Sequence, residues 1–196
     1  MFNKICMTND LWFWIIIGII ATFLIIWLFV SIYRGIKHEM LQILGYLLLM
    51  ASLTLTIGDY PVPSYFEIIG GILGYIALII AFFSVLMANR RWVIRRGIKN
   101  LNKFKNLMIF AYARHPLTLS MIIVSLAVFM INNSVLSNVL CVMAGMCFIL
   151  SSIEKDLFYE QQYGYPYKFY CSKVPRFNLI LGFIRSFKTE KEESRS

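Results

Sequence analysis

Residues 116–153 read PLTLSMIIVSLAVFMINNSVLSNVLCVMAGMCFILSSI, and this uncharged stretch decides the fold of the chain. It is about twice as long as one membrane span needs, because about 20 apolar residues cross a hydrocarbon core of roughly 30 Å. The polar cluster at 132–134 interrupts it in a pattern typical of the turn of a helical hairpin. The stretch therefore predicts two membrane helices, over about 117–131 and 134–153. The first rises only about 22 Å, so a tilted or partly re-entrant hairpin is an open alternative.

Three further uncharged runs precede this hairpin and predict spans at about 11–33, 40–58 and 66–88. The chain of 196 residues is 59% hydrophobic and only 15% charged, which is too apolar for one water-soluble core of ordinary size. The sequence therefore predicts an all-α polytopic membrane protein, with residues 1–196 forming a single membrane domain of about five transmembrane helices.

Basic residues gather in every second connection of this predicted topology. The connection at 34–39 carries two, the connection at 89–116 carries eight without one acid, and the tail from residue 154 onward carries eight. Because basic residues in short loops stay cytoplasmic, the N-terminus is expected outside and these three segments, with the C-terminus, in the cytoplasm. The net charge of +9 then indicates anionic lipid headgroups as partners, and not nucleic acid.

Two basic segments outside the spans have their own predicted structure. Apolar residues recur at helical spacing over about 90–112, which predicts an interfacial helix on the inner leaflet, with a solvated basic linker as the alternative. Residues 188–196 are rich in Lys, Glu and Ser and predict a disordered tail. The two histidines and four cysteines lack metal-ligand spacing, so no metal site is expected.

Polar residues capable of chemistry flank the predicted hairpin on both sides. In a hairpin the start of the first helix and the end of the second are neighbours, so Arg114 and His115 are expected near Glu154 and Asp156. Arg114 offers a fork for a carboxylate, and His115 titrates near neutral pH. The two acids offer acceptors for an ammonium or for ribose hydroxyls. This charge pattern predicts a zwitterionic ligand with an amino-acid head, and the alternative is that the same charges only snorkel, cap and pair at helix ends.

The start of the first hairpin helix supports the same prediction. Pro116 suits the first helical turn because its missing N–H would be unpaired there in any case. The free amides that follow make a partly positive helix start that favours a carboxylate or a phosphate.

A family resemblance is carried by several motifs in order over residues 109–178. They are Arg114-His115-Pro116, Ile153-Glu154-Lys155-Asp156-Leu157, Tyr163-Gly164, Tyr167, Tyr170 and Val174-Pro175-Arg176-Phe177. This set resembles the isoprenylcysteine carboxyl methyltransferase and phospholipid methyltransferase superfamily of integral membrane enzymes.

The resemblance implies S-adenosylmethionine as cofactor, bound in a catalytic region at the cytoplasmic end of the hairpin. A lipophilic acceptor, prenyl-type or phospholipid-type, would enter sideways from the bilayer. The residues that the resemblance assigns to catalysis are Arg114, His115 and Glu154. Those that it assigns to cofactor binding are Tyr112, Arg114, His115, Pro116, Glu154, Asp156, Tyr167 and Tyr170. Those that it assigns to the acceptor are Ser151, Arg176 and Phe177.

Three positions depart from the family pattern. Thr118 stands where the motif has Tyr, and Ser120 where it has Gly. Ser151 stands where the prenylcysteine enzymes place a basic residue for the acceptor carboxylate, so farnesylcysteine analogues are expected to be poor acceptors. Two other classes stay open: an NADPH-dependent membrane reductase related to the sterol reductases, and a non-catalytic membrane scaffold.

Overall fold

The computed structural model describes residues 3–55, 64–88, 113–132 and 134–178, and most of these residues are helical, with no strand among them. The helices are α1 (Asn3–Arg34), α2 (Lys37–Leu55), α3 (Ser64–Ala88), α6 (Pro116–Ile131), α7 (Val135–Tyr163) and α8 (Tyr165–Lys173). The predicted all-α class is confirmed for this part of the chain. The interfacial helix predicted at 90–112 and the tail predicted at 188–196 lie outside the described residues.

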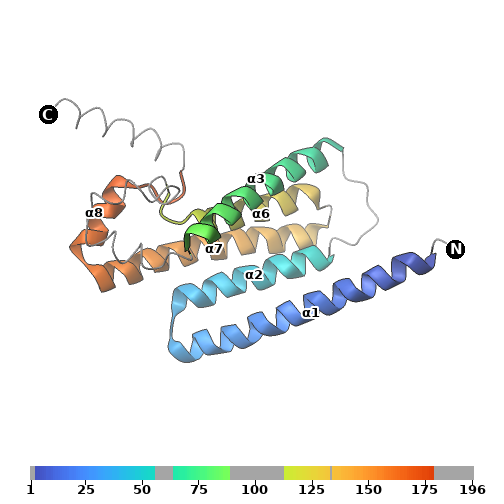
Figure 1. The fold of residues 1–196 in the computed structure, drawn as a ribbon, viewed down its shortest axis with the longest axis horizontal. Helices are drawn as coiled ribbons and strands as arrows, with labels where there is room; N and C mark the ends of the chain where they lie inside the picture. Colours follow the sequence, from blue (N-terminus) through green and yellow to red (C-terminus); the bar gives the residue numbers. More distant parts are fainter. Residues whose placement is uncertain (1–2, 56–63, 89–112, 133, 179–196) are drawn as a thin grey trace.

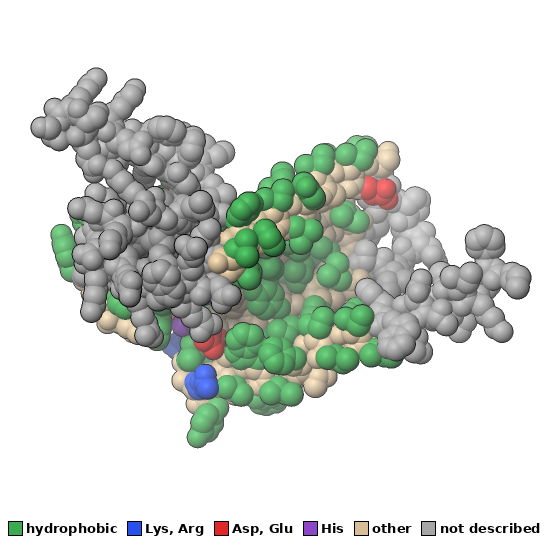
Figure 2. All heavy atoms as spheres, in the orientation of Figure 1, with side chains coloured by type: hydrophobic (Ala, Val, Ile, Leu, Met, Phe, Trp, Pro, Cys, Tyr) green, Lys and Arg blue, Asp and Glu red, His purple; other side chains and the backbone are tan. Residues whose placement is uncertain are grey.

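Four of these helices, α1, α2, α3 and α7, are long and apolar enough to cross a membrane. The fifth expected span is α6, a mainly apolar helix whose 16 residues rise about 24 Å, less than the hydrocarbon core of roughly 30 Å. Apolar side chains cover most of the described surface in Figure 2, and the charged ones in view lie toward the helix ends.

The hairpin of α6 and α7 forms the centre of the bundle (Figure 1). Helix α3 packs along α6, α2 packs along α7, and α1 packs on α2 at the edge of the bundle. These helices approach each other closely where a glycine on one faces a large side chain on the other. A Cβ on Gly45 of α2 would lie 2.8 Å from Cε1 of Phe148 on α7, and a Cβ on Gly70 of α3 would lie 2.5 Å from Cγ1 of Ile131 on α6. Small residues at helix contacts are how membrane helices gain packing contact.

Helix α7 is longer than the span predicted at 134–153, because it continues to Tyr163. The charged residues that begin at Glu154 end the apolar run, but they do not interrupt the helix, since Glu and Lys favour helical backbone. The helix stops at Gly164, whose φ of +65° is a conformation that side chains with a Cβ rarely adopt. After this glycine, α8 turns back toward the end of α7 (Figure 1).

The other glycine turn lies between α1 and α2, at Gly35, whose φ is +67°. This turn, the start of α6 and the α7–α8 turn all lie at one end of the bundle in Figure 1. Those are the segments whose basic residues were expected to share one side of a membrane, so this end gathers the residues that can carry chemistry.

Candidate functional site

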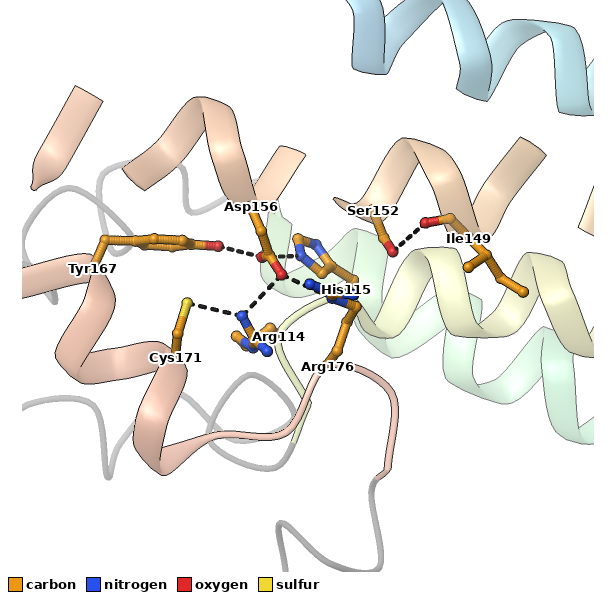
Figure 3. Close-up of polar contacts among 8 residues, drawn as sticks. All are labelled: Arg114, His115, Ile149, Ser152, Asp156, Tyr167, Cys171 and Arg176. Carbon is orange, nitrogen blue, oxygen red and sulfur yellow. Dashed lines mark hydrogen bonds and ion pairs between the residues drawn. The ribbon is translucent and has the colours of Figure 1, made fainter. Parts of the chain in front are cut away.

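The carboxylate of Asp156 is the centre of a polar cluster at this end of the bundle (Figure 3). Its side chain is 9% exposed and projects from α7 toward the segment that leads into α6. Residues from three separate parts of the chain reach it: Arg114 and His115 before α6, Tyr167 on α8, and Arg176 beyond α8. A hairpin therefore brings together groups that lie some forty residues apart in sequence.

Both oxygens of Asp156 accept two hydrogen bonds each. Oδ1 is 2.7 Å from Nε2 of His115 and accepts from the Tyr167 hydroxyl at 2.7 Å. Oδ2 accepts from Nη1 of Arg114 at 2.9 Å and from Nε of Arg176 at 2.8 Å. Since an ionised carboxylate has about four lone-pair sites, Asp156 is fully occupied by donors from its own chain.

The protonation states of the cluster follow from these contacts. Burial lowers the pKa of His115, against the opposing pull of Asp156, so the imidazole is neutral at pH 7 with its proton on Nε2. Burial, and then the hydrogen bond to Asp156, raise the pKa of Tyr167, so its hydroxyl keeps the proton that it donates. Two guanidinium groups and one carboxylate leave the cluster with a net charge of +1.

Main-chain hydrogen bonds join the segment that contains Arg114 to the segment that contains Arg176. The N–H of Arg114 donates to the carbonyl oxygen of Pro175 at 3.1 Å, and the N–H of His115 donates to that of Arg176 at 3.3 Å. The segment after α8 thereby lies alongside the segment that enters α6. Both arginines reach Asp156 from this paired backbone.

Arg114 has one buried nitrogen without a hydrogen-bond partner among the described residues. Its Nη1 donates to Asp156 and lies 2.8 Å from Sγ of Cys171, but its Nε is buried without a hydrogen-bond partner among the described residues. Leaving a buried charged donor unpaired is costly. This nitrogen is therefore the group in the cluster best placed to receive an anionic ligand atom.

Tyrosines form one wall beside the cluster. The rings follow one another in the order Tyr163, Tyr159, Tyr167 and Tyr170, with neighbouring centroids 5.6 to 6.0 Å apart. Burial raises the pKa of Tyr170, so this hydroxyl is neutral as well. Aromatic faces of this kind attract cations.

The structure brings together most, but not all, of the predicted site residues. Arg114, His115, Asp156, Tyr167 and Arg176 meet in one cluster, and Pro116 and Tyr170 are buried beside it at the start of α6 and on α8. Tyr112 lies outside the described residues. Phe177 is half-buried.

Glu154 and Ser151 lie apart from this cluster. Glu154 is half-buried and makes no hydrogen bond or ion pair among the described residues, so Asp156 is the acid that meets Arg114 and His115. Ser151 is 1% exposed, and its hydroxyl donates to the backbone oxygen of His38 at 2.7 Å. This serine joins α7 to α2.

Sequence reasoning missed Cys171 as a contact of Arg114. The available signal was spacing, because Cys171 follows Tyr167 by four residues and so lies on the same face of α8. Within the described ranges, no group of three or more His, Cys, Asp and Glu side chains is placed to hold a metal ion.

Comparison of the chain with protein-family models, with curated proteins and with solved structures finds no match.

Proposed function

We propose that this protein is an integral membrane methyltransferase that uses S-adenosylmethionine to methylate a lipophilic acceptor at the cytoplasmic face of its membrane. The observation that carries the proposal is the cluster around Asp156. Motif residues that the sequence relates only by resemblance, Arg114, His115, Tyr167 and Arg176, converge there on one carboxylate. They leave a buried guanidinium nitrogen free, beside a wall of tyrosine rings.

The residues present fit the charges of an S-adenosylmethionine molecule. Its carboxylate would accept from Nε of Arg114, the unpaired buried donor. Its sulfonium would lie against tyrosine faces such as those of Tyr163 and Tyr170. When bound, the cofactor supplies an electrophilic methyl group, so direct displacement requires alignment of the acceptor and no covalent enzyme nucleophile.

Asp156 has a supporting role in this proposal. Because all its lone pairs are taken, it holds Arg114, His115, Tyr167 and Arg176 in place and does not itself bind the ammonium group of the ligand. Glu154, which has no hydrogen-bond partner among the described residues, is the acid left for that ammonium.

The membrane arrangement completes the proposal. In the proposed arrangement, α6 is a fifth span beside the four helices that are long and apolar enough to cross a membrane, the N-terminus lies outside, and the end of the bundle that carries Asp156 lies in the cytoplasm. This orientation is supported by the basic residues of the three segments at that end. An acceptor dissolved in the bilayer then meets the site at the inner membrane surface.

The rival function is a non-catalytic membrane scaffold. The four hydrogen bonds that Asp156 accepts favour it, because such bonds can also serve only to hold the ends of the helices together. The test is transfer of label from S-adenosyl-[methyl-³H]methionine into organic-extractable lipid by the protein in native membranes. The methyltransferase should incorporate label that S-adenosylhomocysteine suppresses, whereas equal label in membranes without the protein would support the scaffold.

A further inference from the structure

Cys171 touches the cluster around Asp156, and the family resemblance assigns it no role. It lies on α8, four residues after Tyr167, so both side chains project from one face of this helix. The Tyr167 hydroxyl donates to Oδ1 of Asp156 at 2.7 Å, and Sγ of Cys171 lies 2.8 Å from Nη1 of Arg114. Helix α8 therefore contacts both members of the Arg114–Asp156 ion pair (Figure 3).

The packing of α8 sets the position of the Cys171 sulfur. Cys171 packs against the buried side chains of Tyr167, Tyr170 and Val174. Burial raises the pKa of its thiol, against the opposing effect of the Arg114 charge. The sulfur is therefore neutral at pH 7, and it accepts the hydrogen bond that Nη1 of Arg114 donates.

The contacts of Arg114 with Asp156 and Cys171 both come from one nitrogen, Nη1. Its two N–H bonds lie in the plane of the guanidinium group, because that group is planar. One donates to Oδ2 of Asp156 at 2.9 Å and the other to Sγ of Cys171 at 2.8 Å. Two acceptors fix the orientation of this plane. One acceptor alone would leave the group free to turn about the line from Nη1 to Oδ2.

The orientation of the guanidinium plane decides what Nε of Arg114 can reach. An arginine frequently meets a carboxylate with two parallel hydrogen bonds from two of its nitrogens. Arg114 donates to Asp156 from Nη1 only, and its Nε stays buried without a partner among the described residues. Because an unpaired buried donor costs free energy, the group would gain by turning a second nitrogen toward Asp156. The hydrogen bond to Cys171 opposes that turn.

We propose that Cys171 is a positioning residue, which holds the guanidinium group of Arg114 so that Nε stays available for the carboxylate of the ligand. The inference rests on the proposed methyltransferase function. It gives α8 a part in recognising the amino-acid head of S-adenosylmethionine. Ligands that carry this head should therefore depend on Cys171, and ligands without it should not.

The test compares two ligands that differ in this head. S-adenosylhomocysteine carries the amino-acid carboxylate, whereas 5′-methylthioadenosine has the adenosine and a thioether without it. Calorimetric titration of the protein in nanodiscs measures both affinities. Cys171→Ala should weaken S-adenosylhomocysteine binding by about five- to tenfold, part of the contribution of a hydrogen bond between charged groups, and should change 5′-methylthioadenosine binding by less than about twofold. Cys171→Ser keeps an acceptor and should bind both ligands like the wild type.

A double-mutant cycle with Arg114→Ala separates positioning from packing. Because Cys171 is proposed to act only through Arg114, adding Cys171→Ala to Arg114→Ala should not weaken S-adenosylhomocysteine binding further. Three results would overturn the inference: unchanged S-adenosylhomocysteine binding in Cys171→Ala, equal weakening of both ligands, or an undiminished effect of Cys171→Ala when Arg114 is absent. Failure of the wild type to bind either ligand would instead contradict the methyltransferase function itself.

Discussion

Replacing Asp156 with alanine is expected to lower the free energy of unfolding by about 3–5 kcal/mol, the usual cost of removing one partner from a buried ion pair. The variant leaves donors of Arg114, His115, Tyr167 and Arg176 without their acceptor, and two of these carry a positive charge. The measurement is reversible unfolding of the protein in bilayer discs or mild detergent. Asp156→Asn is expected to lose slightly less, because its amide keeps one acceptor oxygen.

The matched control for Asp156 is Glu160→Ala, one turn further along α7. Glu160 pairs with Lys168 at 2.8 Å, but both side chains are well exposed, so the control should unfold like the wild type. Equal stability of Asp156→Ala and Glu160→Ala would contradict the role given to the four-donor carboxylate.

Replacing Arg114 with alanine is expected to weaken S-adenosylhomocysteine binding by at least tenfold. The loss follows from removing the unpaired Nε, the donor proposed for the ligand carboxylate, together with a permanent positive charge. Calorimetric titration of the purified variant measures the change. Arg114→Lys should recover only part of the affinity, because an ammonium keeps the charge and loses the fork.

Arg176→Ala is the control that separates a direct role in ligand binding from a role in stabilising the cluster around Asp156. It also removes one positive donor from Oδ2 of Asp156, but it leaves Nε of Arg114 in place. Its affinity for S-adenosylhomocysteine should fall by less than threefold. Equal losses in the two variants would show that Arg114 acts only through Asp156, and no loss in Arg114→Ala would remove it from the site.

Much of the fold and the main contact of the site could be predicted from sequence. The uncharged run with a polar break predicts the α6–α7 hairpin, and hairpin geometry alone places Arg114 and His115 beside the acids that follow residue 153. The all-α class likewise follows from four runs that have the length and composition of membrane helices.

The choice between two nearby acids could not be predicted in the same way. Glu154 and Asp156 differ by about 200° around a helix, so only one of them can face the start of α6. Sequence fixes their separation but not the rotation of α7, which depends on packing against α2 and α6. The same rotation directs Ser151 toward His38 and away from the Asp156 cluster.

The contacts made by helices outside the hairpin could not be predicted from the sequence either. The turn at Gly164 determines where α8 places Tyr167 and Cys171, and no periodic pattern encodes that direction. His38 is remote from the motifs in sequence, and it reaches their neighbourhood only because α2 packs along α7.

The measurement that tests the central claim most directly is calorimetric titration of the wild-type protein in detergent with S-adenosylhomocysteine, with NADPH titrated in parallel. The methyltransferase account predicts saturable binding of S-adenosylhomocysteine, its loss in His115→Ala, and no binding of NADPH. Binding of NADPH alone would place the protein with the reductases, and binding of neither ligand would contradict the account in favour of a scaffold.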